Sequence, residues 1–341
     1  MKKYLLLSIS ALLALTACGT AETSSSQEPT SLEPTSIEPT SQEELSEDET
    51  SEELSYDTSD IRIIAPTGAP TLALYNKIDQ LTTNSTPSNV GAQLQADNYD
   101  AVVFDFYNGL KSIKNNNGHY KLARILTAGN LYLVGINKEG DPQEGDVIVS
   151  FGEGLLPDLA FNEIYGNSGA TVKYVTGGVS AIPSVMTNAM YLGEKVDYVV
   201  IAEPVLTSTL STVEDKSIYH KTLISEKWKE LKGEDALIPQ AGLFINMNSY
   251  ENNEEKYQQF LEEINEDIAS GLENPTLIKD AFESVGDTNA QKDRFGIPGA
   301  MAFKVTNSGN GVGLVSSYTS NVISSFLSDI NNSEDYSAYI L

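Results

Sequence analysis

Cysteine and histidine are nearly absent from this chain. Its 341 residues include one cysteine and two histidines, His119 and His220. One thiol cannot form a disulfide within the chain, and so few ligands exclude a thiolate or multi-histidine metal centre. Both histidines lie in polar stretches, which disfavours a Ser-His-Asp arrangement. The composition therefore predicts no metal and no cofactor, and it argues against an enzyme.

Basic residues are missing from one long segment. Residues 19–60 contain no Lys or Arg but thirteen acidic residues, in a background of Ser, Thr, Glu and Pro with a five-residue Glu-Pro-Thr repeat. Such a stretch buries too little apolar surface to offset its chain entropy, so we expect it to be disordered. Like charges and proline extend it, which predicts a spacer. A tail that binds a partner is the alternative.

The remaining residues, 61–341, carry the fold. They hold 19 basic and 35 acidic residues, a formal charge near −16. A surface this acidic repels phosphate backbones, so no nucleic-acid partner is expected. The length suits one two-lobed unit or two domains.

The first eighteen residues have the layout of a secretory signal. Lys2 and Lys3 precede an apolar run from Tyr4 to Leu15 that is too short for a permanent membrane span. The following Thr16-Ala17-Cys18 completes a pattern that resembles the bacterial lipobox. The pattern implies a signal peptide over residues 1–17, lipidation of Cys18, and an extracytoplasmic protein anchored to the bacterial cell membrane. An ordinary secreted protein with an accidental cysteine is the alternative.

Short apolar runs alternate with helical patterns from residue 61 onward, which predicts an α/β fold with mostly parallel sheets. Strands are expected at Ile61–Ile64, Ala101–Phe104, Leu131–Ile136, Asp146–Phe151, Val172–Val175, Val196–Ala202 and Gly242–Ile245. Helices are expected over Thr71–Asp79, Ala181–Leu192 with Ser180 as N-cap, Glu254–Ser270 ended by Gly271, and 322–330.

Small and polar residues follow five of these strands. Ligands of open α/β sheets collect at the carboxyl ends of strands, where helix starts offer free N–H groups. The candidate ligand-binding residues are Thr67, Gly68, Ala69, Thr71, Asp105, Phe106, Asn130, Gly152, Glu153, Gly154, Gly178, Ser180 and Glu203. For any single loop, the alternative is that these residues only form tight turns and helix caps.

The order of these motifs resembles the type II periplasmic binding proteins of ABC transporters. Gly152–Gly154, Gly177-Gly178 and the strand Val196–Ala202 closed by Glu203-Pro204 are similar to the second lobe of that family. Gly68-Ala69-Pro70-Thr71 resembles the first ligand loop, and Ala241–Ile245 the return to lobe one. The resemblance is strongest to the group that binds thiamine-precursor pyrimidines, sulfonates and nitrate.

The resemblance implies two lobes joined by two hinge strands, Leu131–Ile136 and Gly242–Ile245. Lobe one would comprise residues 61–139 and 241–341, and lobe two residues 140–240. A small molecule would bind between the lobes of a monomer and pass to the transmembrane subunit of an ABC permease.

The candidate loops contain no Lys or Arg, which disfavours an anionic ligand. Asp105, Glu153 and Glu203 could accept hydrogen bonds from amino groups, and Phe106 could stack on a flat ring. We therefore expect a nitrogen heterocycle, such as a thiamine or flavin precursor. The alternatives are a sulfonate or nitrate ligand, and carboxylates that cap helices or, for Glu203, face solvent.

Two other classes of function compete with transport. Pyrimidine synthases share this fold, but they need an active-site histidine and a cysteine-rich run that the chain does not offer. A surface sensor or adhesin on the same fold would bind a protein partner instead. It would not gain thermal stability from a small molecule, whereas a solute-binding protein would.

Overall fold

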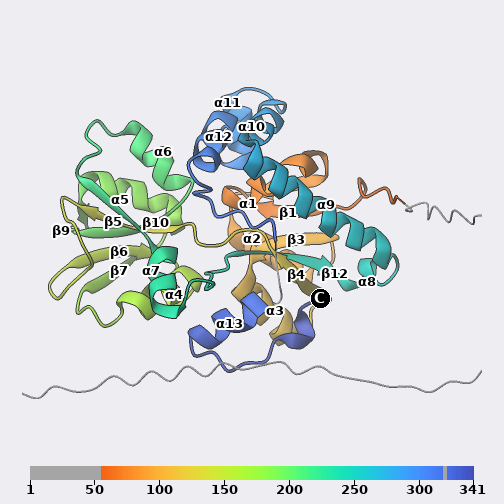
Figure 1. Ribbon diagram of the computed structural model, residues 1–341, viewed down its shortest axis with the longest axis horizontal. Coiled ribbons are helices and arrows are strands. Elements are labelled where there is room, and N and C mark those ends of the chain that lie inside the picture. The colour runs from red at the N-terminus through yellow and green to blue at the C-terminus, as the bar shows by residue number, and fades with distance from the viewer. Residues whose placement is uncertain (1–54, 318–320) are drawn as a thin grey trace, which may run out of the picture. The chain divides into compact units, whose positions relative to one another are not determined.

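The computed structural model describes residues 55–317 and 321–341. The predicted signal peptide, Cys18 and the linker up to residue 54 lie outside these residues. The described part is α/β and contains two five-stranded mixed sheets (Figure 1). We call the parts of the molecule around the first and the second sheet lobe one and lobe two.

In the first sheet, four strands run in one direction and one strand runs in the opposite direction. Its order is β2 (Leu81–Asn84), β1 (Ile63–Pro66), β3 (Ala101–Asp105), β12 (Ala241–Asn246) and β4 (Tyr120–Ile125). β1 pairs in parallel with β2 and β3, and β12 is antiparallel to both β3 and β4.

The second sheet repeats this scheme. Its order is β11 (Tyr219–Leu223), β5 (Leu131–Ile136), β10 (Tyr198–Ala202), β6 (Val147–Phe151) and β7 (Thr171–Val175). β10, β6 and β7 are parallel, whereas β5 is antiparallel to β10 and β11. The sheets are therefore more mixed than predicted, because each contains two antiparallel pairings.

Helices cover both sheets. They are α1 (Ala69–Leu72), α2 (Pro87–Gly91), α3 (Phe106–Asn116), α4 (Leu156–Tyr165), α5 (Ile182–Asn188), α6 (Val205–Thr212), α7 (Ile224–Lys232), α8 (Met247–Tyr250), α9 (Glu254–Glu273), α10 (Pro275–Glu283), α11 (Thr288–Phe295), α12 (Gly299–Asn307) and α13 (Asn321–Asp329). Among the described residues, no helix combines the length and apolar character that a membrane crossing requires.

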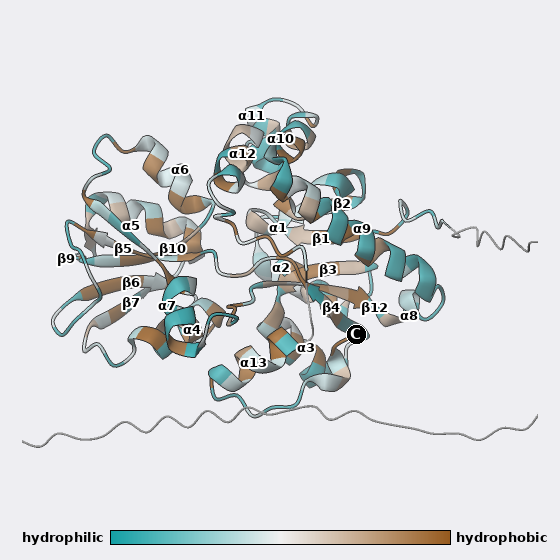
Figure 2. Ribbon diagram, in the orientation of Figure 1, coloured by the Kyte–Doolittle hydropathy of each residue, from teal (hydrophilic) through white to brown (hydrophobic). Residues whose placement is uncertain are grey.

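The central strands are apolar on both faces because each sheet is buried between helices. In β3, Ala101 and Val103 pack in the core beneath α9, α10 and α12, while Val102 packs on the α3 and α13 side. Figure 2 shows apolar central strands and a polar outer surface on α9. This double burial is why the run Ala101–Phe104 was predictable as a strand.

Two crossover segments run side by side between the sheets. The chain leaves β4 through residues 126–130 and returns to β12 through residues 236–240. Ala128 forms an isolated antiparallel bridge with Pro239, and Thr127 forms one with Leu314. The predicted hinge strands are thus the strands that follow each crossing, and each is a full member of a sheet. Leu131–Ile136 lies in the second sheet, so we propose that lobe two begins before Leu131 instead of after residue 139.

Three helix predictions were wrong in detail. The pattern over Thr71–Asp79 is split into α1 and a 3₁₀ turn at Tyr75–Gln80. The helix from Ala181 ends at Asn188, because Ala189 adopts φ +52° and Met190 enters a hairpin with Lys195. Gly271 is buried inside α9 and does not end it. A Cβ there would come within 2.9 Å of Tyr75 Cε1, so close packing explains this glycine.

The last residues of the predicted linker are ordered against α9. The Tyr56 N–H donates to Gln259 Oε1 at 2.7 Å, and Gln259 Nε2 donates to the Tyr56 carbonyl at 2.9 Å. Thr58 Oγ1 donates to Glu263 at 2.7 Å, and Lys256 pairs with Asp60. The folded unit therefore starts before residue 61, as a strap on α9.

Candidate functional site

A small cavity lies where the carboxyl ends of β1 and β3 meet the crossover segments. Its volume is about 210 Å³. The lining residues are Pro66, Ala69, Pro70, Pro87, Phe104, Asp105, Thr127, Asn130, Gln240 and Ala241. We call it the crossover cavity. It brings together three of the predicted ligand residues, Ala69, Asp105 and Asn130, and its described lining residues include neither Lys nor Arg.

Asp105 is the N-cap of α3 and the one carboxylate of the crossover cavity. Its Oδ1 accepts from the Asn108 N–H at 2.8 Å and from Asn108 Nδ2 at 3.0 Å. Burial raises the pKa of this carboxyl from 3.8 to about 6, although these hydrogen bonds act in the opposite direction. Asp105 thus caps a helix, as the alternative interpretation held, and is also a partly exposed residue that lines the cavity.

Asn130 and Glu203 join the crossover to lobe two. The Glu203 N–H donates to the Asn130 carbonyl at 3.0 Å, and Asn130 Nδ2 donates to the Glu203 carbonyl at 3.3 Å. The Glu203 carboxylate accepts from the Thr207 N–H at 3.0 Å and from Thr207 Oγ1 at 2.7 Å. Glu203 is therefore buried and caps α6. It does not face solvent, and its charge is committed to a helix start.

The first predicted loop, Thr67 to Thr71, is held from behind by the end of α11. The Gly68 N–H donates to the Phe295 carbonyl at 2.8 Å. Gly68 adopts φ +104°, a conformation that L side chains rarely adopt, so glycine is needed here. The Thr71 side chain is fully buried and its hydroxyl donates to the Gly68 carbonyl at 2.7 Å. Thr71 therefore shapes the loop and presents no free group to a ligand.

The predicted loops of lobe two are exposed at the ends of β6 and β7, and none of their residues lines the crossover cavity. Gly152 and Gly154 both have positive φ, and the Gly154 N–H donates to Asp158 Oδ2 at 2.9 Å. Ser180 is not the N-cap of α5. Its hydroxyl donates to the Gly177 carbonyl at 2.9 Å, and Ala181 occupies the cap position. Glu153 is an exposed turn residue, and Gly178 is exposed at the start of a 3₁₀ helix, Gly178–Ala181.

Phe106 does not reach the crossover cavity. Its side chain is fully buried and packs edge-on against Phe326, with 5.6 Å between ring centroids. The expected stacking role was wrong because the first residue of α3 points into the core between α3 and α13. Phe104, which lines the cavity, provides the aromatic wall instead. Strand alternation could not have identified Phe104, because it places Phe104 and Asp105 on opposite faces of β3, whereas both residues line the cavity at the end of the strand.

Changing Gly91 is expected to alter the crossover cavity through Phe104. A Cβ at Gly91 would lie 2.6 Å from Phe104 Cζ, so the ring must move. We expect Gly91→Ala to weaken ligand binding about 10-fold, an effect comparable to one misplaced contact. Isothermal titration measures it, with Ala92→Ser, an exposed change in the neighbouring residue, as control. Equal affinities of Gly91→Ala and wild type would contradict this placement of Phe104.

A second cavity separates α5 and α6 of lobe two from α11 and α12 of lobe one. Its volume is about 400 Å³, and Lys292 is the one charged side chain among its described lining residues. The other lining residues are Pro183, Ser184, Thr187, Pro204, Val205, Ser208, Thr209, Thr212, Gly296, Ile297, Pro298 and Met301. We call it the helix-pair cavity. No sequence pattern indicated that Lys292 would line a cavity together with residues of lobe two.

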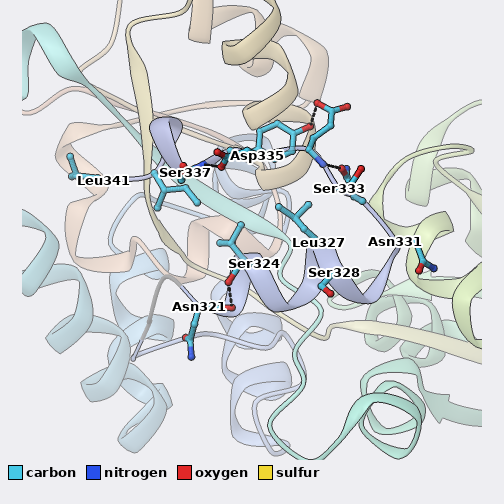
Figure 3. A pocket seen from close by; sticks show the side chains of 14 residues that line it. Asn321, Ser324, Leu327, Ser328, Asn331, Ser333, Asp335, Ser337 and Leu341 are labelled. Atoms are coloured by element: carbon cyan, nitrogen blue, oxygen red, sulfur yellow. Dashed lines mark hydrogen bonds between the residues drawn. The ribbon is translucent and has the colours of Figure 1, made fainter.

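The largest cavity described lies elsewhere, between α13 and the C-terminal segment, with a volume of about 860 Å³ (Figure 3). Ser324, Leu327 and Ser328 of α13 line one side of it. It contains none of the predicted ligand residues and does not lie at the carboxyl end of a strand. Size alone therefore does not make it the candidate site.

Solved structures share this architecture. One is an ABC transporter structure from Parabacteroides distasonis. The match covers 80% of this chain and 92% of that chain, with a TM-score of 0.57 and 16% sequence identity. Another is the ligand-binding component of an ABC-type import system from Staphylococcus aureus, with zinc bound. The match covers 82% of this chain and 96% of that chain, with a TM-score of 0.59 and 10% sequence identity. This chain has the periplasmic-binding-protein fold.

A third structure with this fold is the periplasmic aliphatic sulphonate binding protein from Escherichia coli. The match covers 80% of this chain and 85% of that protein, with a TM-score of 0.52 and 11% identity. No protein-family profile and no curated protein sequence matches the chain. At these identities, the likeness establishes the two-lobed type II fold. In this fold, the crossover cavity lies beside the connections between the lobes.

Proposed function

We propose that this protein binds a small solute outside the cytoplasm and delivers it to an ABC permease. The crossover cavity carries this proposal, because it joins strand ends of a binding-protein fold to the crossover segments between two lobes. A ligand that contacts both lobes would favour a closed form, which is the state that a permease could recognise. The lipobox-like Cys18 and the acidic linker support a monomer held at the membrane surface.

The chemistry of the cavity favours a nitrogen heterocycle. Asp105 offers a carboxylate oxygen, and three prolines with Phe104 provide flat apolar walls. A carboxylate without a neighbouring cation repels anions and accepts hydrogen bonds from amino groups. A planar ring with an amino group, such as a thiamine or flavin precursor, fits this set of groups.

A thermal-shift screen of the full-length chain tests the proposal. We expect a thiamine-precursor pyrimidine at about 100 times its Kd to stabilise the fold by about 2.7 kcal/mol, raising Tm by about 5 °C or more. Heat-unfolded chain and unrelated sugars serve as controls. A protein that gains no stability from any solute of the screen would support the surface sensor or adhesin alternative and exclude transport.

A sulfonate or nitrate ligand is the second candidate, and one observation favours it. Lys292 lines the helix-pair cavity, has no ion-pair partner among the described residues, and shares the cavity with no carboxylate. Ethanesulfonate and nitrate therefore belong in the same screen. If these anions raise the Tm of the wild type but not that of Lys292→Ala, the ligand is an anion and not a nitrogen heterocycle.

A further inference from the structure

Gln240 is placed beside Asp105 by the pairing of two distant strands. β12 is antiparallel to β3, and Ala241 is the residue opposite Asp105. Gln240 directly precedes this pair, on the crossover that returns to lobe one. Gln240 and Asp105 therefore both line the crossover cavity, although they are far apart in the sequence.

The backbone of Gln240 is fixed on both sides. Its N–H donates to the Thr127 carbonyl at 2.9 Å, and its carbonyl accepts from the Phe106 N–H at 2.9 Å. One bond ties it to the other crossover and one to the start of α3. A residue held in this way presents its side chain at a defined position, which is what a selective contact requires.

The side chains around Gln240 are largely committed to the protein. Asn130 Nδ2 donates to Glu203, Thr127 Oγ1 accepts from the Ala241 N–H, and Asp105 Oδ1 accepts from Asn108. In contrast, the Gln240 carboxamide has no hydrogen-bond partner among residues 55–317 and 321–341. It is partly exposed in the cavity and offers both a donor and an acceptor.

We propose that Gln240 is a specificity-determining residue that donates a hydrogen bond to a ring nitrogen of the ligand, next to an amino group that donates to Asp105. This inference rests on the proposed function. It narrows the solute to a planar heterocycle with an amino group adjacent to an acceptor nitrogen. A ring that presents a carbonyl to Asp105 would be rejected, because two acceptors would face each other.

Two probes and two variants separate these contacts. The probes are 4-amino-5-hydroxymethyl-2-methylpyrimidine and its analogue without the amino group, titrated calorimetrically against the full-length chain. Gln240→Leu leaves the ring nitrogen of both probes unpaired, so we expect the Kd of each to rise about 10- to 100-fold. Asp105→Asn changes the partner of the amino group, so it should weaken the first probe and change the second by less than about 2-fold.

The matched control is Gln258→Leu, the same chemical change at an exposed position of α9. Because the Gln240 side chain has no partner in the described protein, Gln240→Leu should keep the Tm of the ligand-free wild type. Binding of both probes by Gln240→Leu within about 2-fold of wild type would overturn the inference and leave the proposed function standing. If the wild type binds neither probe, the inference and the heterocycle ligand both fail.

Discussion

Trp228→Ala is expected to lower the free energy of unfolding by about 3–5 kcal/mol, the range found when a buried aromatic is truncated. Trp228 is fully buried in α7, and its ring centroid lies 5.4 Å from that of Phe326 in α13. The Phe326 ring also contacts Phe106 of α3. Removing the indole therefore leaves a cavity between α7, which follows the second sheet, and α3 and α13, which cover the first sheet.

Urea unfolding followed by circular dichroism measures this loss. Leu231→Ala is the control, because Leu231 lies on the same helix and is 53% exposed, so its truncation should cost less than about 0.5 kcal/mol. Trp228→Phe should cost less than the alanine variant, since the indole N–H has no hydrogen-bond partner in the part of the chain that the structure describes. A loss below about 1 kcal/mol for Trp228→Ala would show that α7 and α13 do not pack as described.

Asp105→Asn is expected to weaken ligand binding about 10- to 100-fold while making the ligand-free protein more stable at neutral pH. A hydrogen bond to a charged group accounts for the first effect. The second follows from the pKa of about 6 in the folded protein, above the ordinary 3.8. The contribution of Asp105 to stability is complete below pH 3.8 and is lost as the pH rises through 6.

Asparagine can still cap α3 and carries no charge, so the variant avoids that loss. We expect it to exceed wild type by about 1–2 kcal/mol at pH 7.5 and to equal it near pH 4, as urea unfolding at both values would measure. Ligand affinity of the wild type should fall below pH 6 as the carboxylate is protonated. Asp293→Asn, an exposed change on α11, is the control. A variant less stable than wild type at pH 7.5 would contradict the assigned pKa.

Local patterns were sufficient where burial on both faces left an apolar run. Ala101–Phe104 and Leu131–Ile136 were predicted as strands for this reason, and the amphipathic face of α9 was equally clear. Local patterns were not sufficient where the same apolar spacing fits both a helix and a strand. Met190 has helical spacing from Met186, yet it lies in a hairpin because the Leu192-Gly193 turn lets Met190 pair with Lys195.

The candidate site was predicted only in part, because its composition depends on strand pairing. Asp105 and Asn130 follow apolar runs and could be found from the sequence. Gln240 could not, since it enters the cavity through the antiparallel pairing of β12 with β3. Phe106 was assigned to the ligand although the packing of α13 turns its ring into the core. Such contacts are set by the tertiary structure.

The strap formed by Tyr56 to Asp60 determines which lobe bears a mechanical load. Its hydrogen bonds to Gln259 and Glu263 attach the chain to α9, whose apolar face packs on the first sheet. A pull applied along the chain ahead of Ser55 would therefore reach lobe one directly. Among the described residues, lobe two takes no part in this attachment, so a movement of lobe two relative to lobe one would leave the strap in place.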